Sequence, residues 1–248
     1  MRDNFIYNQD CLKTLKKMED SSVDLVLTSP PYNMNLRIFY GKYRSRQVTK
    51  ELSTKYSNFS DNMPIEDFYN FHLKVIKELI RVSNIVFYNI QIVTGSKRAF
   101  FKIIGEMNEF LKDIIVWDKT HGQPAIGKQV LNRQSELLLI FEKDYPISRQ
   151  FRKTGYFDRG TLTDLWSIPR AYQKSHENGA VFPEALVEKV LKNFTKEGDL
   201  IYDPFFGTGT TGVVAKKMGR RYIGSEISKE YVKIARERIK KSKKNEYI

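Results

Sequence analysis

The chain has few of the residues that build disulfides and metal centres. Its 248 residues include one cysteine, Cys11, and three histidines. A single cysteine excludes an intrachain disulfide and a cysteine-rich metal site, which fits a reducing cytoplasm. Because the three histidines do not belong to a closely spaced cluster with Asp or Glu, we expect no catalytic metal.

Long apolar runs are also missing. No stretch approaches the ~20 apolar residues that cross a membrane, and residues 1–4 contain no apolar signal core. We therefore expect a cytoplasmic protein with no membrane partner. Internal repeats, low-complexity tracts and long linkers are absent, and 41% apolar composition suits one globular α/β domain over residues 1–248.

Acidic residues are outnumbered by basic ones. The 42 Lys and Arg residues against 29 Asp and Glu give a net charge of +13, the electrostatic footprint of a protein that binds a phosphate backbone. Basic and aromatic residues are mixed in two segments, near 33–62 and 144–175, which we predict to be inserted DNA-contacting segments. In the second segment, the residues suited to groove contacts are Arg149, Arg152, Lys153, Arg159, Arg170, Lys174, Tyr156, Phe157, Trp166 and Tyr172.

A pair of prolines follows an apolar run near the N-terminus. Residues 23–28 predict a buried strand, and Ser29-Pro30-Pro31-Tyr32 comes directly after it. Consecutive prolines fix φ and remove two backbone donors, so the loop is rigid and rich in acceptors. Ser29 Oγ and the Pro30 carbonyl could accept the two hydrogens of a planar amino group, and Tyr32 offers a flat face to a base. A Pro-Pro pair alone would indicate only a turn, so this interpretation depends on a second motif.

The second motif is a strand, a glycine turn and a helix. Residues 199–203 predict the strand, Gly207 and Gly209 the turn, and residues 210–218 the helix. This arrangement is a cradle for an adenosine-containing cofactor at a strand end. Glu226 follows the next strand, about 20 positions on, where a nucleotide-binding fold holds the ribose hydroxyls. No Lys follows the glycines directly, which argues against an ATPase phosphate loop.

The middle of the chain alternates strands and helices. This alternation predicts a doubly wound, mostly parallel sheet with helices on both faces. The expected elements are helices at 66–81 and 97–111 and strands at 84–88, 113–118 and 136–141, the last two separated by a loop that includes residues 121–127. Trp117 is expected to be a core residue.

The two motifs resemble those of a known family. Ser29-Pro30-Pro31-Tyr32 is similar to the catalytic motif of the DNA amino-methyltransferases, which move a methyl group from S-adenosylmethionine to adenine N6 or cytosine N4. The segment Asp203-Pro204-Phe205-Phe206-Gly207-Thr208-Gly209 is similar to their cofactor motif. The order of the motifs resembles the beta class, a circular permutation of the Rossmann-like methyltransferase chain, whose last strands form an antiparallel edge.

The resemblance also implies a set of site residues. Asp10, beside Cys11, looks like the acid that contacts the adenine ring, and Phe182-Pro183 looks like the segment that closes over the methionine part of the cofactor. His176 departs from the family pattern, in which His is followed by Pro. The implied catalytic residues are Ser29, Pro30, Pro31 and Tyr32, and the implied cofactor residues are Asp10, Cys11, Phe182, Pro183, Asp203, Pro204, Phe205, Gly207, Gly209, Thr210 and Glu226.

Three functions remain open at this point. Within this resemblance, serine in the first motif position leans toward cytosine N4. The leading prediction is therefore site-specific methylation of cytosine N4 in double-stranded DNA, with the base flipped out of the stack. The alternatives are adenine-N6 methylation of DNA and a non-catalytic DNA- or nucleotide-binding module, while RNA and protein glutamine are further substrates. A second copy of the chain and a cognate restriction endonuclease are hypothetical partners.

Overall fold

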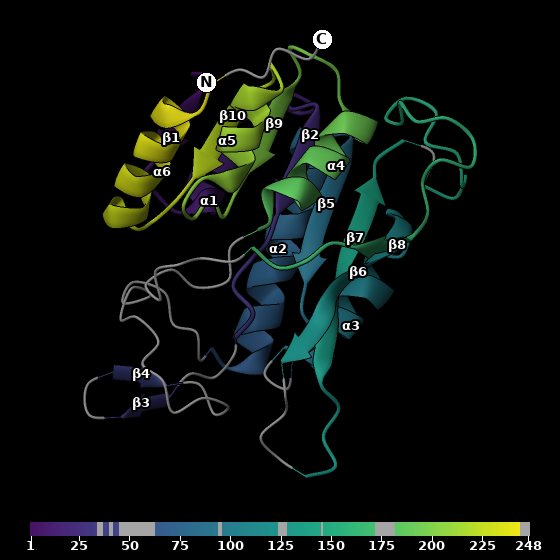
Figure 1. Ribbon diagram of the computed structural model, residues 1–248, viewed down its shortest axis with the longest axis vertical. Helices are drawn as coiled ribbons and strands as arrows, with labels where there is room; N and C mark the ends of the chain where they lie inside the picture. Colours follow the sequence, from purple (N-terminus) through teal and green to yellow (C-terminus); the bar gives the residue numbers. More distant parts are fainter. Residues whose placement is uncertain are drawn as a thin grey trace.

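The computed structural model describes residues 1–33, 37–39, 42–44, 63–93, 96–123, 128–144, 146–171 and 182–243. Its centre is an eight-stranded sheet in the order β1-β10-β9-β2-β5-β7-β6-β8 (Figure 1). The strands in that order are β1 (Phe5–Tyr7), β10 (Arg221–Ser225), β9 (Leu200–Asp203), β2 (Leu25–Thr28), β5 (Ile85–Ile90), β7 (Arg133–Glu142), β6 (Leu111–Gln123) and β8 (Leu165–Ser167).

All of these strands except β7 run in one direction. Strand β7 is antiparallel to both of its neighbours, β5 and β6, whereas the edge strand β8 is parallel to β6. The predicted doubly wound, mostly parallel sheet is therefore confirmed. The expectation of an antiparallel edge is wrong in one respect, because the chain after β7 returns to add β8 outside β6.

Helices cover both faces of the sheet because its strands carry apolar side chains on both sides. In β2, Leu25 and Leu27 join the core on one face and Val26 the core on the other. Such two-sided burial is expected for parallel strands. The first core is covered by α4 (Glu184–Phe194), α5 (Thr210–Lys217) and α6 (Lys229–Lys241), and the second by α1 (Cys11–Leu15), α2 (Ile65–Val82) and α3 (Lys97–Glu106).

Two predicted boundaries in the middle of the chain are corrected. The helix expected over residues 97–111 ends at Glu106, because residues 107–110 form a turn and Leu111 already begins β6. Strand β6 continues to Gln123, so His121 and Gly122 lie in a strand and not in a loop.

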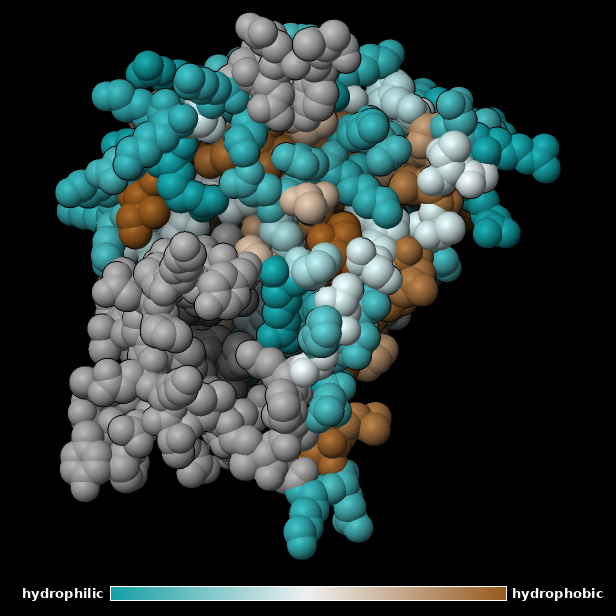
Figure 2. All heavy atoms as spheres, viewed as in Figure 1, coloured by the Kyte–Doolittle hydropathy of each residue, from teal (hydrophilic) through white to brown (hydrophobic). Residues whose placement is uncertain are grey.

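Figure 2 shows hydrophobic side chains near the far end of the β6–β7 hairpin, where Val130 and Leu131 are 56% and 86% exposed.

The segment expected to contact DNA near 144–175 is partly core. Trp166, on β8, is fully buried and donates its indole N–H to the Thr163 carbonyl at 2.7 Å. The ring of Phe157 packs 5.3 Å from that of Phe194. Groove contact by Trp166 is therefore a wrong prediction, whereas that of the partly buried Phe157 stays a prediction. Arg149, Arg152 and Arg159 are exposed. Tyr172, Lys174 and His176 lie outside the described residues.

The segment near 33–62 also lies mostly outside the described residues. Its described part contains β3 (Arg37–Phe39) and β4 (Lys42–Arg44), which pair as an antiparallel hairpin. The segment predicted to contact DNA thus includes a short two-stranded hairpin.

Most glycines around the second motif make room for protein atoms. A Cβ added to Gly224 would lie 2.3 Å from the ring of Phe206, and one added to Gly209 would lie 2.7 Å from Ala235 Cβ. By contrast, a Cβ on Gly207 would meet only the Phe205 carbonyl, at 3.9 Å. Gly207 therefore leaves open space for a ligand, whereas Gly209 allows close packing against α6, and contact of either glycine with a cofactor stays a prediction.

We expect Gly224→Ala to destabilise the protein by roughly 1–3 kcal/mol, because the new methyl group must displace Phe206 in a packed core. The free energy of unfolding in urea measures this loss. Gly105→Ala is the matched control, since an added Cβ at Gly105 meets nothing within 4 Å. Equal losses in both variants would contradict the packing role of Gly224.

A buried carboxylate connects three elements of the fold. Asp203 Oδ1 accepts hydrogen bonds from Thr28 Oγ1 at 2.7 Å and from the Phe205 N–H at 3.0 Å. Its Oδ2 accepts from Thr211 Oγ1 at 2.7 Å. Burial raises the pKa of Asp203 from 3.8 to about 6, although these three hydrogen bonds favour the charged form. Asp203 thus joins β2, the turn after β9 and α5.

This raised pKa predicts a specific pH dependence of stability. Between pH 3.8 and about 6 the folded protein retains a proton on Asp203 that the unfolded chain releases, so stability falls as pH rises through this window. The loss amounts to about 3 kcal/mol for a shift of this size. Asp203→Asn should flatten the unfolding free energy across this window, and Asp113→Asn, at an exposed position, should not. Identical slopes in the wild type and Asp203→Asn would assign the titration to another group.

Candidate active site

The two motifs meet at one edge of the sheet. Strands β2 and β9 pair in parallel with Val26 opposite Tyr202, so Ser29 and the turn after Asp203 follow neighbouring strand ends. Glu226 follows the next strand, β10, and Asp10 follows β1 beyond it. The structure therefore brings the catalytic motif, the glycine turn, Glu226 and Asp10 to the same carboxyl edge, the usual ligand-binding edge of such sheets.

Glu226 is held by the glycine turn. Its Oε2 accepts the Gly207 N–H at 2.9 Å and its Oε1 accepts the Ser228 N–H at 2.8 Å. Burial raises the pKa of this carboxyl, and the same backbone hydrogen bonds oppose the rise. A carboxylate has about four acceptor positions, so Glu226 retains capacity for ribose hydroxyls.

The surroundings of Gly207 fit a nucleoside cofactor. This glycine has a left-handed φ of 51° and open space where a side chain would be. Pro204 and Phe205 complete the turn, and the ring of Phe205 lies 6.2 Å from that of Phe71. An adenosine group would thus be held by the open turn and the Glu226 carboxylate.

Other predicted cofactor residues already have structural contacts. Asp10 caps α1 by accepting the Leu12 N–H at 2.8 Å. Cys11 is buried, and this burial raises the pKa of its thiol, so it is a small core residue. Thr210 Oγ1 accepts a hydrogen bond from Arg238 at 3.3 Å. The contact of these three residues with a cofactor stays a prediction.

Phe182 and Pro183 lie at the start of α4. Pro183 is the N-cap residue of that helix. The Phe182 ring lies 6.3 Å from Trp117, which is a buried residue of β6, as predicted from the sequence. This contact connects the start of α4 to β6.

The predicted catalytic loop has a fixed tyrosine. Tyr32 is 8% exposed, and its Oη lies 2.6 Å from Ser29 Oγ. The same Oη lies 3.1 Å from Glu136 Oε2 and 2.5 Å from Asn89 Nδ2. Burial, followed by the charge of Glu136, raises the pKa of Tyr32 well above its ordinary value. Tyr32 is therefore a protonated hydrogen-bonding group as well as a flat apolar surface.

Three polar residues of this site lie outside the sequence motifs and were not predicted. Asn89 lies in β5, Glu136 in β7 and Lys119 in β6. Asn89 Nδ2 donates to Glu136 Oε2 at 2.6 Å, and Lys119 Nζ donates to Glu136 Oε1 at 2.9 Å. For Lys119 and Glu136 the available signal was a charged residue within or next to an apolar strand, because Lys and Glu are rarely buried without a partner.

The Lys119–Glu136 pair is nearly inaccessible to solvent. The side chain of Lys119 is 1% exposed and that of Glu136 is 9% exposed. Burial lowers the pKa of Lys119, and the charge of Glu136 opposes this change. Asn89 Oδ1 is also buried and has no hydrogen-bond partner among the described residues. This corner of the site is therefore polar although it is enclosed.

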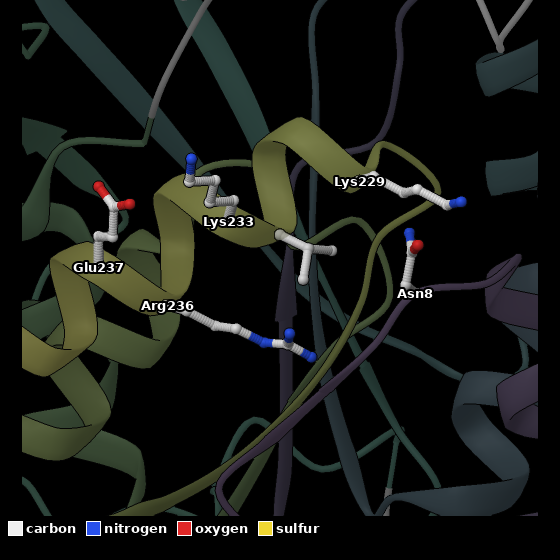
Figure 3. A pocket seen from close by; sticks show the side chains of 6 residues that line it. Asn8, Lys229, Lys233, Arg236 and Glu237 are labelled. Carbon is white, nitrogen blue, oxygen red and sulfur yellow. The ribbon is translucent and has the colours of Figure 1, made fainter.

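A separate pocket of about 380 Å³ lies along α6 (Figure 3). It is lined by Asn8, Lys229, Val232, Lys233, Arg236 and Glu237. Asn8 Nδ2 donates to the carbonyls of Glu226 and Ile227, at 2.8 and 3.0 Å. Arg236 donates to the Ile6 carbonyl at 3.4 Å. These two residues thus attach β1 and the residues after it to α6 and its preceding loop, and the pocket contains none of the predicted catalytic residues.

Metal ligands do not gather in the part of the chain that the structure describes, where no three His, Cys, Asp or Glu side chains could hold an ion. Within the same residues, no helix is long and apolar enough to cross a membrane.

Comparison with known proteins agrees with this geometry. A family model described as DNA methylase, of the N6 and N4 type, matches residues 23–237. The chain is 30% identical over 245 residues to the type II methyltransferase M2.DpnII of Streptococcus pneumoniae, covering 94% of this chain and 88% of that protein. The match includes both motifs and the strands between them.

Solved structures show the same fold. The PvuII DNA methyltransferase, described as cytosine-N4-specific, aligns with a TM-score of 0.72 and 19% identity over 100% of this chain and 89% of its own. The complex of M1.HpyAVI with SAM aligns with a TM-score of 0.64 and 21% identity over 94% of this chain and 98% of its own. The resemblance read from the two motifs is confirmed: this chain belongs to the DNA methylase family and is a DNA amino-methyltransferase of the N4/N6 kind.

Proposed function

We propose that the enzyme transfers a methyl group from S-adenosylmethionine to cytosine N4 in double-stranded DNA. The observation that carries the proposal is the placement of Ser29, hydrogen-bonded to Tyr32, at the strand end next to the glycine turn. The methylase family match and the solved complex of M1.HpyAVI with SAM support the cofactor. Within this proposal, one strand end provides the amino acceptor and its neighbour holds the methyl donor.

S-adenosylmethionine, when bound, would supply an electrophilic methyl group: the bond from carbon to sulfur would break, S-adenosylhomocysteine would leave, and the amino nitrogen would release one of its two protons to water. Ser29 Oγ and the Pro30 carbonyl accept the two hydrogens of the amino group, which favours the pyramidal nitrogen with an available lone pair. Tyr32 stacks against the base through its ring. Because the base stack of a duplex encloses the face of the amino nitrogen that carries its lone pair, the target base has to be flipped into this site.

The choice of cytosine depends on Ser29. A serine hydroxyl is a weaker acceptor than the carboxylate of aspartate, and within the family resemblance it leans toward cytosine N4. Adenine N6 is the alternative target, with the same site and the same cofactor. The methylated nucleoside released from the product DNA distinguishes the two.

The exposed arginines after β7 supply part of the proposed DNA-binding surface. Arg149, Arg152 and Arg159 are exposed, in a chain with a net charge of +13. Phosphate contacts by such residues position the duplex without reading its sequence. The type II relatives support a further proposal, that the enzyme acts beside a cognate restriction endonuclease.

The first test measures transfer of a labelled methyl group to mixed-sequence duplex DNA, followed by digestion to nucleosides. We expect label in N4-methylcytosine. Label in N6-methyladenine would overturn the choice of base and keep the site, whereas DNA without label would overturn the proposed activity.

Ser29→Ala should lower kcat by roughly 10²- to 10³-fold, the usual effect of removing one hydrogen-bonding group that acts in the transition state. Binding of S-adenosylmethionine, measured by calorimetry, should stay within about threefold, because the side chain of Ser29 is hydrogen-bonded to Tyr32 and Asn89. Ser22→Ala, at an exposed position before β2, is the control. Retained kcat in Ser29→Ala would remove Ser29 from the mechanism.

Glu226→Gln should weaken binding of S-adenosylmethionine by about tenfold or more, because a hydrogen bond to a charged group contributes roughly 1.5–3 kcal/mol. Glu230→Gln, at an exposed position in the first turn of α6, should leave the dissociation constant unchanged. Calorimetry measures both. Equal affinities in the two variants would exclude ribose binding by Glu226.

A further inference from the structure

We propose that Glu136, held by Lys119, is a positioning residue that sets the direction of the hydrogen bonds from Ser29 through Tyr32, so that Ser29 presents its lone pairs to the substrate amino group. The inference rests on the proposed function. It assigns a role to two charged residues of β6 and β7 that lie outside both sequence motifs.

The carboxylate of Glu136 is the fixed point of this chain of hydrogen bonds. Lys119 Nζ lies 2.9 Å from Oε1, and both side chains are at most 9% exposed. Oε2 receives Asn89 Nδ2 at 2.6 Å and Tyr32 Oη at 3.1 Å. An ionised carboxylate only accepts hydrogen bonds. Every group around Glu136 must therefore donate to it.

The orientation of Asn89 follows from the same rule. Its Nδ2 atom has two hydrogens, and its two closest oxygens are Glu136 Oε2 at 2.6 Å and Tyr32 Oη at 2.5 Å. The third contact, to Ser29 Oγ, is longer at 3.4 Å. An amide turned the other way would place Oδ1 against the carboxylate, which is unfavourable. Asn89 thus donates to Tyr32 as well as to Glu136.

Tyr32 has one hydroxyl hydrogen, and Glu136 takes it. Since Asn89 also donates to Tyr32 Oη, the remaining 2.6 Å contact between Tyr32 and Ser29 needs a hydrogen from Ser29. The Ser29 hydrogen therefore points toward Tyr32 and away from the substrate. Ser29 Oγ is left as an acceptor for an amino hydrogen, and it has no hydrogen to donate to the nitrogen lone pair that must attack the methyl group.

Glu136→Gln is the sharpest test because it keeps the shape of the side chain. Lys119 still requires an acceptor, so the glutamine carbonyl faces Lys119 and its amide NH₂ faces Tyr32 and Asn89. The amide of Asn89 then turns over, so that Oδ1 accepts where Nδ2 donates in the wild type. Tyr32 then becomes the acceptor at that contact and donates to Ser29, whose hydrogen turns toward the substrate. We expect kcat to fall about 100-fold, the scale of one oriented hydrogen bond in a transition state, while KM for DNA and binding of S-adenosylmethionine change less than threefold.

The same hairpin provides a matched control in Glu142. It pairs with Lys112 at 2.6 Å, again between β6 and β7, and these side chains are 0% and 3% exposed. Its partner on the other side is Thr154 Oγ1 at 2.6 Å, with no contact to Tyr32. Glu142→Gln should therefore lower stability, read as Tm, by an amount similar to Glu136→Gln and should retain kcat.

A double-mutant cycle tests the route through Tyr32. In a Tyr32→Phe background, where the hydroxyl is missing, Glu136→Gln should lower kcat less than twofold further, because contacting residues of one network are not additive. A wild-type kcat in Glu136→Gln, an equal loss in Glu142→Gln, or full additivity with Tyr32→Phe would each overturn the inference while the wild type still methylates DNA. A wild type that labels no amino group in DNA would overturn the proposed function and this inference with it.

Discussion

The site depends on the hydrogen bond between Thr28 and Asp203. Thr28 is the last residue of β2, and Asp203 is the last residue of β9, 175 positions later in the chain. The same carboxylate binds the backbone N–H of Phe205 and the hydroxyl of Thr211. It therefore fixes the residue before Ser29, the start of the glycine turn and the first turn of α5 in one rigid unit. Methyl transfer requires that kind of fixed spacing between donor and acceptor.

The strand order explains why such distant segments can cooperate. Strand β2 from the N-terminal part lies between β9 and β5, so its carboxyl end is flanked by the glycine turn on one side and by Asn89 on the other. Parallel strands place all of these ends at one edge. The antiparallel β7 brings Glu136 to the same edge from its opposite end, since Trp117 of β6 pairs with Glu136. The order of the motifs along the chain is consequently of little importance to the site.

The sequence predicted the parts of the structure that depend on local patterns. Residues 23–28 and 199–203 are apolar runs followed by Pro or Gly, and both are strands that end at the predicted place. It did not predict which glycines are crowded by protein atoms, because Phe206 and Ala235, which crowd Gly224 and Gly209, are distant from them in sequence. The role of Trp166 was missed for a similar reason, since its burial follows from the pairing of β8 with β6.

The two buried Lys–Glu pairs of β6 and β7 differ in what surrounds them. A buried ion pair contributes little net stability, because the free energy lost on removing both charges from water offsets their attraction. Lys112 and Glu142 meet a threonine and a backbone carbonyl, which are groups of the scaffold. Glu136 instead meets Tyr32 and Asn89, which both lie within 3.5 Å of Ser29 Oγ. Glu136 therefore contributes little to stability, and its proposed role, to orient the hydroxyl of Ser29 through Tyr32, explains why a charge is buried at this position.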